Sequence, residues 1–164
     1  MLDLLRLNLT NIKYMPLKEL DRNICALLQG NARMSMNEIA EAVGSSVPTV
    51  SEHIKKLEAD GVIREYTTVL DAAELGFDVT AFIYVDLDSS SAYDGFRRQC
   101  RARRDVLECH AITGTASHVL KVRCVNTAAL EQLLSAIQQW KGVSKTLTNV
   151  VLSTHKEQTQ IPIT

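Results

Sequence analysis

The sequence predicts an α+β protein built from an N-terminal winged helix-turn-helix and a C-terminal ferredoxin-like βαββαβ domain. Two observations support this prediction. Apolar residues recur with a helical period from residue 17 to about residue 63. Beyond residue 78, runs with the two-residue period of strands alternate with helical runs in the order βαββαβ. The length of 164 residues suits two small modules of this kind.

These patterns divide the chain into five parts. We expect an N-terminal extension, a winged helix-turn-helix domain, a linker, a ferredoxin-like domain and a C-terminal tail, at residues 1–16, 17–66, 67–77, 78–155 and 156–164. Residues 1–14 precede the regular pattern, and we interpret them as a real helix or as the product of an upstream start codon. A signal peptide is not expected, because this segment carries an acid and lacks a small-residue cleavage site.

Three short helices are expected in the first module. The third is the clearest, because Ser46 is a good N-cap, Pro48 lies in the first turn and Gly61 ends the helix. Only a few residues separate it from the second helix, which is typical of a helix-turn-helix. The apolar stripes of the three helices are, in order, Leu20, Ile24, Leu27 and Leu28; Met36, Ile39, Ala40 and Val43; and Val50, Ile54 and Leu57.

The pattern changes after the third helix. Residues 62–70, VIREYTTVL, are rich in Val, Ile, Tyr and Thr, which predicts a wing or a connecting strand. In the second module we expect a strand, a helix, two strands, a helix and a strand, at residues 79–88, 91–105, 106–113, 118–125, 126–140 and 143–153. Both helices would pack on one sheet face. Phe82 and Tyr84 point to the other face, which is therefore expected to meet a second copy of the chain.

Composition argues against several classes of protein. A net charge of −1 argues against a protein that binds polyanions through its overall charge, although a local patch can still bind nucleic acid. No apolar run is long enough to span a membrane. The four cysteines have no CxxC spacing, which favours buried thiols of a cytoplasmic protein. The histidines at 110, 118 and 155 lack metal-ligand spacing and a catalytic order, so we expect no catalytic residue, no metal and no cofactor.

Several segments together resemble a known family. LDRNI, GVIREY and LEADG, followed by LECHAITGTASHVLKVRCVN and GVSKTLTNVV, are similar in order and spacing to the leucine-responsive/asparagine-responsive (Lrp/AsnC) family of prokaryotic regulators. The resemblance covers residues 17 to about 153. It implies a transcriptional regulator that binds double-stranded DNA, forms homodimers through its C-terminal sheets, often assembles into octamers and takes free amino acids as effectors.

The polar face of the third helix is the expected DNA-binding surface, because the N-terminal part of such a helix enters the major groove. Glu52 could accept a hydrogen bond from cytosine, and Thr49 could touch a base or a thymine methyl. Family members often carry arginine where His53 stands, and a histidine offers no bidentate fork to guanine. A merely solvated helix face is the alternative. The expected contacts are Ser46, Pro48, Thr49, Glu52, His53, Lys55 and Lys56.

The loop TGTASH is the candidate effector site, since the resemblance implies that it lines a pocket between dimers. Ser117 stands where the family commonly has an aspartate, and His118 stands where it has an aromatic residue. This difference predicts weaker amino-acid binding, another ligand or no response. A plain hairpin turn is the alternative. The expected effector-binding residues are Gly114, Thr115, Ala116, Ser117, His118, Thr148, Asn149 and Val150.

Two further alternatives use the same architecture. Sirohaem decarboxylases resemble it, and in such an enzyme the histidines and arginines would hold a tetrapyrrole. The chain could also be an amino-acid sensor with a degenerate DNA-binding module. The arginine-rich run FRRQCRARRD, at residues 96–105, is interpreted as a solvated helix face rather than a nucleic-acid patch. RNA binding through the sheet is disfavoured, because its central strands lack exposed aromatic residues in HVLKVRCV and HAITG.

Overall fold

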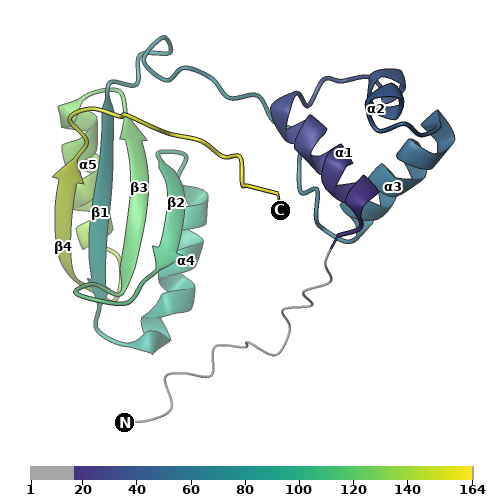
Figure 1. Ribbon diagram of the computed structural model, residues 1–164. Coiled ribbons are helices and arrows are strands. Elements are labelled where there is room, and N and C mark those ends of the chain that lie inside the picture. The colour runs from purple at the N-terminus through teal and green to yellow at the C-terminus, as the bar shows by residue number, and fades with distance from the viewer. Residues whose placement is uncertain (1–16, 164) are drawn as a thin grey trace. The chain divides into compact units, whose positions relative to one another are not determined.

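The computed structural model describes residues 17–163, and the predicted N-terminal extension lies outside these residues. The chain divides into two compact units (Figure 1). Of the described residues, the helical unit contains 17–68 together with 158–163, and the sheet unit runs from Val69 to Glu157.

The helical unit contains the three predicted helices, α1 (Glu19–Gly30), α2 (Met36–Ala42) and α3 (Val47–Ala59). Ser46 caps α3, as expected, and Ser35 caps α2 in a capping box with Glu38. The turn between α2 and α3 contains Gly44 with a φ of +64°, a conformation that glycine adopts without strain. The stripes pack into one core of fully or nearly buried side chains, which includes Ile24, Ile39, Val50, Ile54 and Leu57.

Of the two alternatives expected for residues 62–70, a wing or a connecting strand, the strand is not formed in the single chain. Within the described part of the chain, residues 64–71 form neither helix nor strand. β-Branched residues favour a strand only where a neighbouring strand supplies hydrogen bonds and side-chain contacts. Val69 and Leu70 are instead largely exposed. The Tyr66 hydroxyl donates to the Glu58 carboxylate of α3 at 2.9 Å. Burial, followed by this hydrogen bond, raises the pKa of Tyr66 to about 12.

The sheet unit has the predicted βαββαβ order. Its elements are β1 (Val79–Leu87), α4 (Tyr93–Ala102), β2 (Val106–Ala111), β3 (His118–Cys124), α5 (Thr127–Gln138) and β4 (Val143–Val150). The strands are antiparallel in the spatial order β2-β3-β1-β4, which is the ferredoxin-like arrangement (Figure 1). The helices cover one sheet face, and their core consists of Ala81, Ile83, Val85, Leu120 and Val122 with Phe96, Cys100, Leu130, Leu133 and Ile137.

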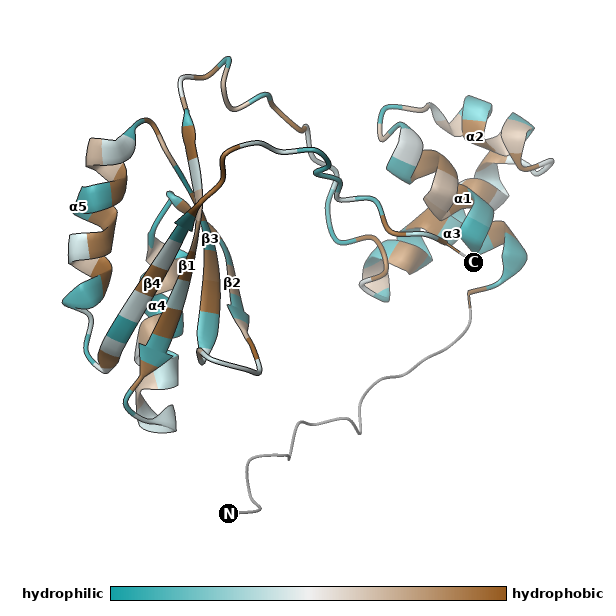
Figure 2. Ribbon diagram, turned by 60° about the vertical axis from the view of Figure 1, so that its left-hand side comes forward, coloured by the Kyte–Doolittle hydropathy of each residue, from teal (hydrophilic) through white to brown (hydrophobic). Residues whose placement is uncertain are grey.

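None of the helices in the described part of the chain packs on the other sheet face. Strand alternation places Phe82, Tyr84 and Asp86 of β1 on this open face. Leu147 and Asn149 of β4 stand opposite Tyr84 and Phe82 in the strand register. The alternation is visible as changing colour along β4 in Figure 2. Phe82 is 37% exposed and Leu147 is 57% exposed, so the single chain leaves apolar surface here uncovered.

Candidate functional site

Helix α3 has one buried side and one solvent-facing side. Val50, Ile54 and Leu57 are buried, as the sequence predicts. Pro48, Glu52, Lys55 and Lys56 are all exposed. Their spacing places a proline and a carboxylate towards the N-terminal half of the helix and two ammonium groups one turn later. This order suits a helix that contacts base edges first and phosphates next.

Ser46 and Thr49 hold the start of α3 together. The Ser46 hydroxyl accepts the Thr49 backbone N–H at 3.4 Å, and the two side-chain hydroxyls lie 2.8 Å apart. Ser46 is therefore engaged in capping, and Thr49 is half-buried beside it. Val47, the first residue of the helix, is 37% exposed. Sequence reasoning missed Val47, although an apolar residue directly after an N-cap was a visible signal.

His53 is engaged by the first helix. Its Nδ1 lies 2.6 Å from Oδ1 of Asp21 on α1. Asp21 is only 8% exposed and lies beside Cys25, whose thiol pKa is raised by burial and by the Asp21 charge. The pair thus links α1 to α3 at the edge of the core. Sequence reasoning missed Asp21, since its partner is 32 positions away.

The TGTASH loop joins β2 to β3 as a tight hairpin. Gly114 has a φ of +116° and is exposed, as is Thr115, whereas Ala116 is buried. Ser117 is tied to β1: its Oγ donates to the Val85 carbonyl at 2.9 Å, and its N–H donates to Asp86 Oδ1 at 3.2 Å. The loop therefore presents Gly114 and Thr115 to solvent and holds Ser117 in place.

His118 belongs to the core of the sheet unit. It is 2% exposed, and its ring packs against Tyr93 and Phe96 with centroids 4.8 and 5.0 Å away. Burial, and to a lesser extent the Arg97 cation, lowers the pKa of His118 below its usual value. A buried, neutral imidazole at this position fills the space between α4 and the sheet, and it does not face solvent beside Gly114.

The three nominated residues of β4 do not share a face. Thr148 and Val150 pair in register with Ile83 and Ala81 of the helix-covered face, whereas Asn149 lies on the open face. His118 pairs with Val85 of β1, whereas Asn149 pairs with Phe82, three residues away on the same strand. With about 3.3 Å per residue and about 4.8 Å between strands, the loop and Asn149 are about 14 Å apart. A single chain does not bring these residues together.

Asp86 is a polar group at the loop that sequence reasoning missed. Its carboxylate lies on the open face and accepts the Ser117 N–H, 31 positions later in the chain. Lys145 of β4 stands opposite Asp86 in the strand register. The loop therefore has an acid beside it, where Ser117 itself supplies only a hydroxyl. The signal in the sequence was an aspartate at an alternate position of an apolar strand.

The remaining candidates have ordinary structural partners. Arg97 pairs with Asp94, and Arg103 pairs with Asp105 at 2.5 Å, as expected of a solvated helix face. His110 lies 3.1 Å from Glu108. Among residues 17–163, no three potential metal ligands gather at one point. None of the helices in that part of the chain is long and apolar enough to cross a membrane.

Comparison with known proteins agrees with both units. The model of the Lrp/AsnC ligand binding domain matches residues 80–161, and that of a winged helix-turn-helix DNA-binding domain matches residues 17–64. The HTH-type transcriptional regulator FL11 of Pyrococcus horikoshii is 34% identical over 148 residues, which cover 90% of this chain and 97% of FL11. The leucine-responsive regulatory protein of Escherichia coli K12 is 29% identical over 150 residues, which cover 90% of this chain and 92% of that protein.

Solved structures agree as well. Transcriptional regulator NMB0573 of Neisseria meningitidis, solved in complex with L-Met, has a TM-score of 0.84 and 28% identity, with 89% of this chain and 96% of that chain covered. AsnC of Escherichia coli has a TM-score of 0.82 and 31% identity, with 89% of this chain and 99% of AsnC covered. These relatives are regulators rather than enzymes, so they lend no support to the tetrapyrrole alternative. The chain belongs to the Lrp/AsnC family of DNA-binding transcriptional regulators.

Proposed function

We propose that this regulator binds pseudo-palindromic double-stranded DNA as a homodimer, with the N-terminal half of α3 in the major groove of each half-site. The observation that carries the proposal is the exposed row of Pro48, Glu52, Lys55 and Lys56 directly after the tight turn from α2. Glu52 accepts from a cytosine amino group, and the two lysines contact phosphates. Val47 adds an apolar contact to a thymine methyl.

Substitutions on α3 test this arrangement. Lys56→Ala should weaken binding to all sequences alike and reduce the slope of log K against log salt by about one per site, because one phosphate contact is lost. Glu52→Ala should instead change the preferred half-site sequence. Fluorescence anisotropy with a library of duplexes, at several salt concentrations, measures both effects. The matched control is Lys141→Ala, an exposed lysine of the sheet unit that should change neither quantity. Unchanged affinity and preference in both α3 variants would refute the assignment.

The open sheet face is the proposed dimer interface. Phe82 and Leu147 expose apolar surface there, and no helix among residues 17–163 covers that face. A second copy would bury this surface, and burial stabilises a dimer by about 25 cal/mol for each Å² of apolar area removed from water. Dimers are proposed to assemble further into octamers. Phe82→Asp with Leu147→Asp should yield monomers by sedimentation velocity, while Leu152→Asp, at an exposed leucine beyond β4, should not. Unchanged dimers in the double variant would place the interface elsewhere.

The proposed effector is a free amino acid, as in the L-Met complex of the Neisseria relative. The backbone N–H groups of Gly114 and Thr115 are suited to its carboxylate, and the Asp86 carboxylate is suited to its ammonium group. Because the site lies at the edge of the open face, a second copy is expected to complete it. An apolar or uncharged amino acid fits best, since His118 is buried with a lowered pKa and offers no charge.

Calorimetry across the twenty amino acids tests this site. Asp86→Asn should weaken binding by about tenfold or more, because the ammonium group loses a charged acceptor. Asp88→Asn, two residues further along, changes an exposed acid and should leave binding unchanged. Equal loss in both variants, or no loss in Asp86→Asn, would move the effector site away from Asp86.

A further inference from the structure

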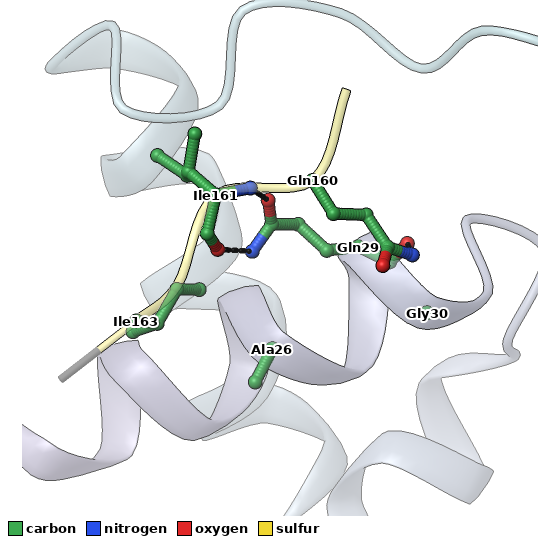
Figure 3. Close-up of a pocket in the computed structure, with 6 residues that line it drawn as sticks. All are labelled: Ala26, Gln29, Gly30, Gln160, Ile161 and Ile163. Carbon is green, nitrogen blue, oxygen red and sulfur yellow. Dashed lines mark hydrogen bonds between the residues drawn. The ribbon is translucent and has the colours of Figure 1, made fainter. Parts of the chain in front are cut away.

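The C-terminal segment belongs to the helical unit. From Gln158 onward the chain groups with α1–α3 and not with the strand that precedes it. Figure 3 shows Gln160, Ile161 and Ile163 alongside Gln29 and Ala26 of α1. Neither the DNA-binding face of α3 nor the effector loop uses this contact, so it requires its own explanation.

The Gln29 side chain holds the tail by its backbone. Gln29 Nε2 donates to the Ile161 carbonyl at 3.1 Å, and the Ile161 N–H donates to Gln29 Oε1 at 2.9 Å. In an extended chain the N–H and C=O of one residue point the same way, so a single carboxamide can satisfy both. Figure 3 shows these two bonds side by side. This geometry recognises an extended peptide regardless of the side chain of the central residue.

A third hydrogen bond completes the end of α1. The Gln160 side chain donates to the Gln29 backbone carbonyl at 2.7 Å. Gln29 lies in the last turn of α1, where carbonyl groups have no partner within the helix. The tail thus supplies a donor that the helix end lacks.

Pro162 and Ile163 also favour docking of the tail, Pro162 through backbone conformation and Ile163 through apolar contact. A residue before proline is restricted to extended conformations, so Pro162 favours the shape in which Ile161 meets Gln29. Ile163 is half-buried and packs against the core of the helical unit. The segment Gln-Ile-Pro-Ile therefore combines three hydrogen bonds to Gln29, a backbone conformation favoured by proline and an apolar anchor.

The face of α1 under the tail is shaped for a main chain. Ala26, Gln29 and Gly30 are spaced i, i+3 and i+4, so they lie on one side of the helix. Because two of these residues are small, a hollow of about 190 Å³ remains between the helix and the tail. On the other side of Gln158, Glu157 is bonded to Lys121 and Arg123 of β3. Ion pairs and hydrogen bonds thus hold the chain on both sides of Gln158.

We propose that this face of α1 is a peptide-binding site whose ligand is the protein's own C-terminal tail. The tail is a releasable strap that docks along α1 within the helical unit. The inference stands apart from DNA and effector binding, because it rests on contacts within the helical unit alone. Its tests therefore need neither operator nor amino acid.

Binding in trans is the direct test. A chain ending at Glu157 is titrated into a fluorescent peptide of residues 156–163, and anisotropy is followed. The truncated chain should bind the peptide, and the full-length chain should bind it more weakly, because its site is occupied. Gln29→Ala in the truncated chain should weaken binding at least about fivefold, since two hydrogen bonds are lost. A peptide with Ile163→Asp should bind less tightly as well.

A matched control and a second readout keep the test decisive. Asn37→Ala removes an exposed carboxamide from α2, away from the tail, so peptide binding should persist. If the truncated chain does not fold, full-length Gln29→Ala and Asn37→Ala are compared by thermal unfolding, and only Gln29→Ala should melt at a lower temperature. No binding of the peptide to a folded truncated chain, or equal effects of Gln29→Ala and Asn37→Ala, would overturn the proposal.

Discussion

Replacing His53 with alanine should destabilise the helical unit while leaving the preferred DNA sequence unchanged. His53 Nδ1 lies 2.6 Å from the carboxylate of Asp21, a side chain that is 8% exposed. Removing the imidazole takes a hydrogen-bond partner from a buried acceptor, which costs about 1–3 kcal/mol. For a domain of this size, a loss of about 1 kcal/mol lowers the melting temperature by about 4–8 °C.

Circular dichroism at 222 nm measures this loss, because α1, α2 and α3 contain more helical residues than α4 and α5. The single tryptophan, Trp140, packs in the core of the sheet unit, so its fluorescence reports on that unit separately. The tryptophan transition should stay in place in His53→Ala. A shift of both transitions would mean that the substitution acts on more than the helical unit.

A double-mutant cycle with Asp21→Ala isolates the pair. The double variant should lose at least about 1 kcal/mol less than the sum of the single losses, since each single variant already breaks the contact. A coupling energy below about 0.3 kcal/mol would refute the bracing role. The bracing role would also be refuted if His53→Ala changed the preferred operator sequence, as is expected for Glu52→Ala.

Three further predictions concern the sheet unit. The lowered pKa of His118 means that the unfolded state takes up its proton more readily, so stability should rise with pH up to about 6.5 and fall below it. His118→Phe should remove that part of the pH dependence of tryptophan-detected unfolding. The Cys100 thiol donates to the Cys109 thiolate and lowers the pKa of Cys109 to about 7. Iodoacetamide should therefore alkylate Cys109 first of the four thiols, and Cys100→Ala should slow this reaction. Gly142→Ala should cost about 2 kcal/mol or more in denaturant unfolding, because φ is +88° and the new Cβ would lie 2.3 Å from Ala92 Cβ. Ala92→Gly in the same chain should recover only the part due to that clash.

The effector site illustrates what local pattern cannot predict. The sequence places Gly114 in a hairpin, because a glycine between two strand-like runs is a local feature. It does not reveal that His118 faces the core or that Asp86 accepts the Ser117 N–H. Those facts depend on strand register, and a shift of one residue in register exchanges the two faces of a strand.

What the sequence determined by itself is the set of local elements and their order. Caps at Ser35 and Ser46, the apolar stripes of α1–α3 and the alternation of β1 follow from short-range hydrogen bonding and burial. Residues 62–70 show the limit of this local information, because a strand needs a neighbouring strand and the described residues supply none there. Only the tertiary structure decided that Asp21 meets His53 and that Gln29 holds Ile161, 132 positions later. Such pairings join segments that are distant in the chain, and they form when the packing of whole elements brings two polar groups together away from water.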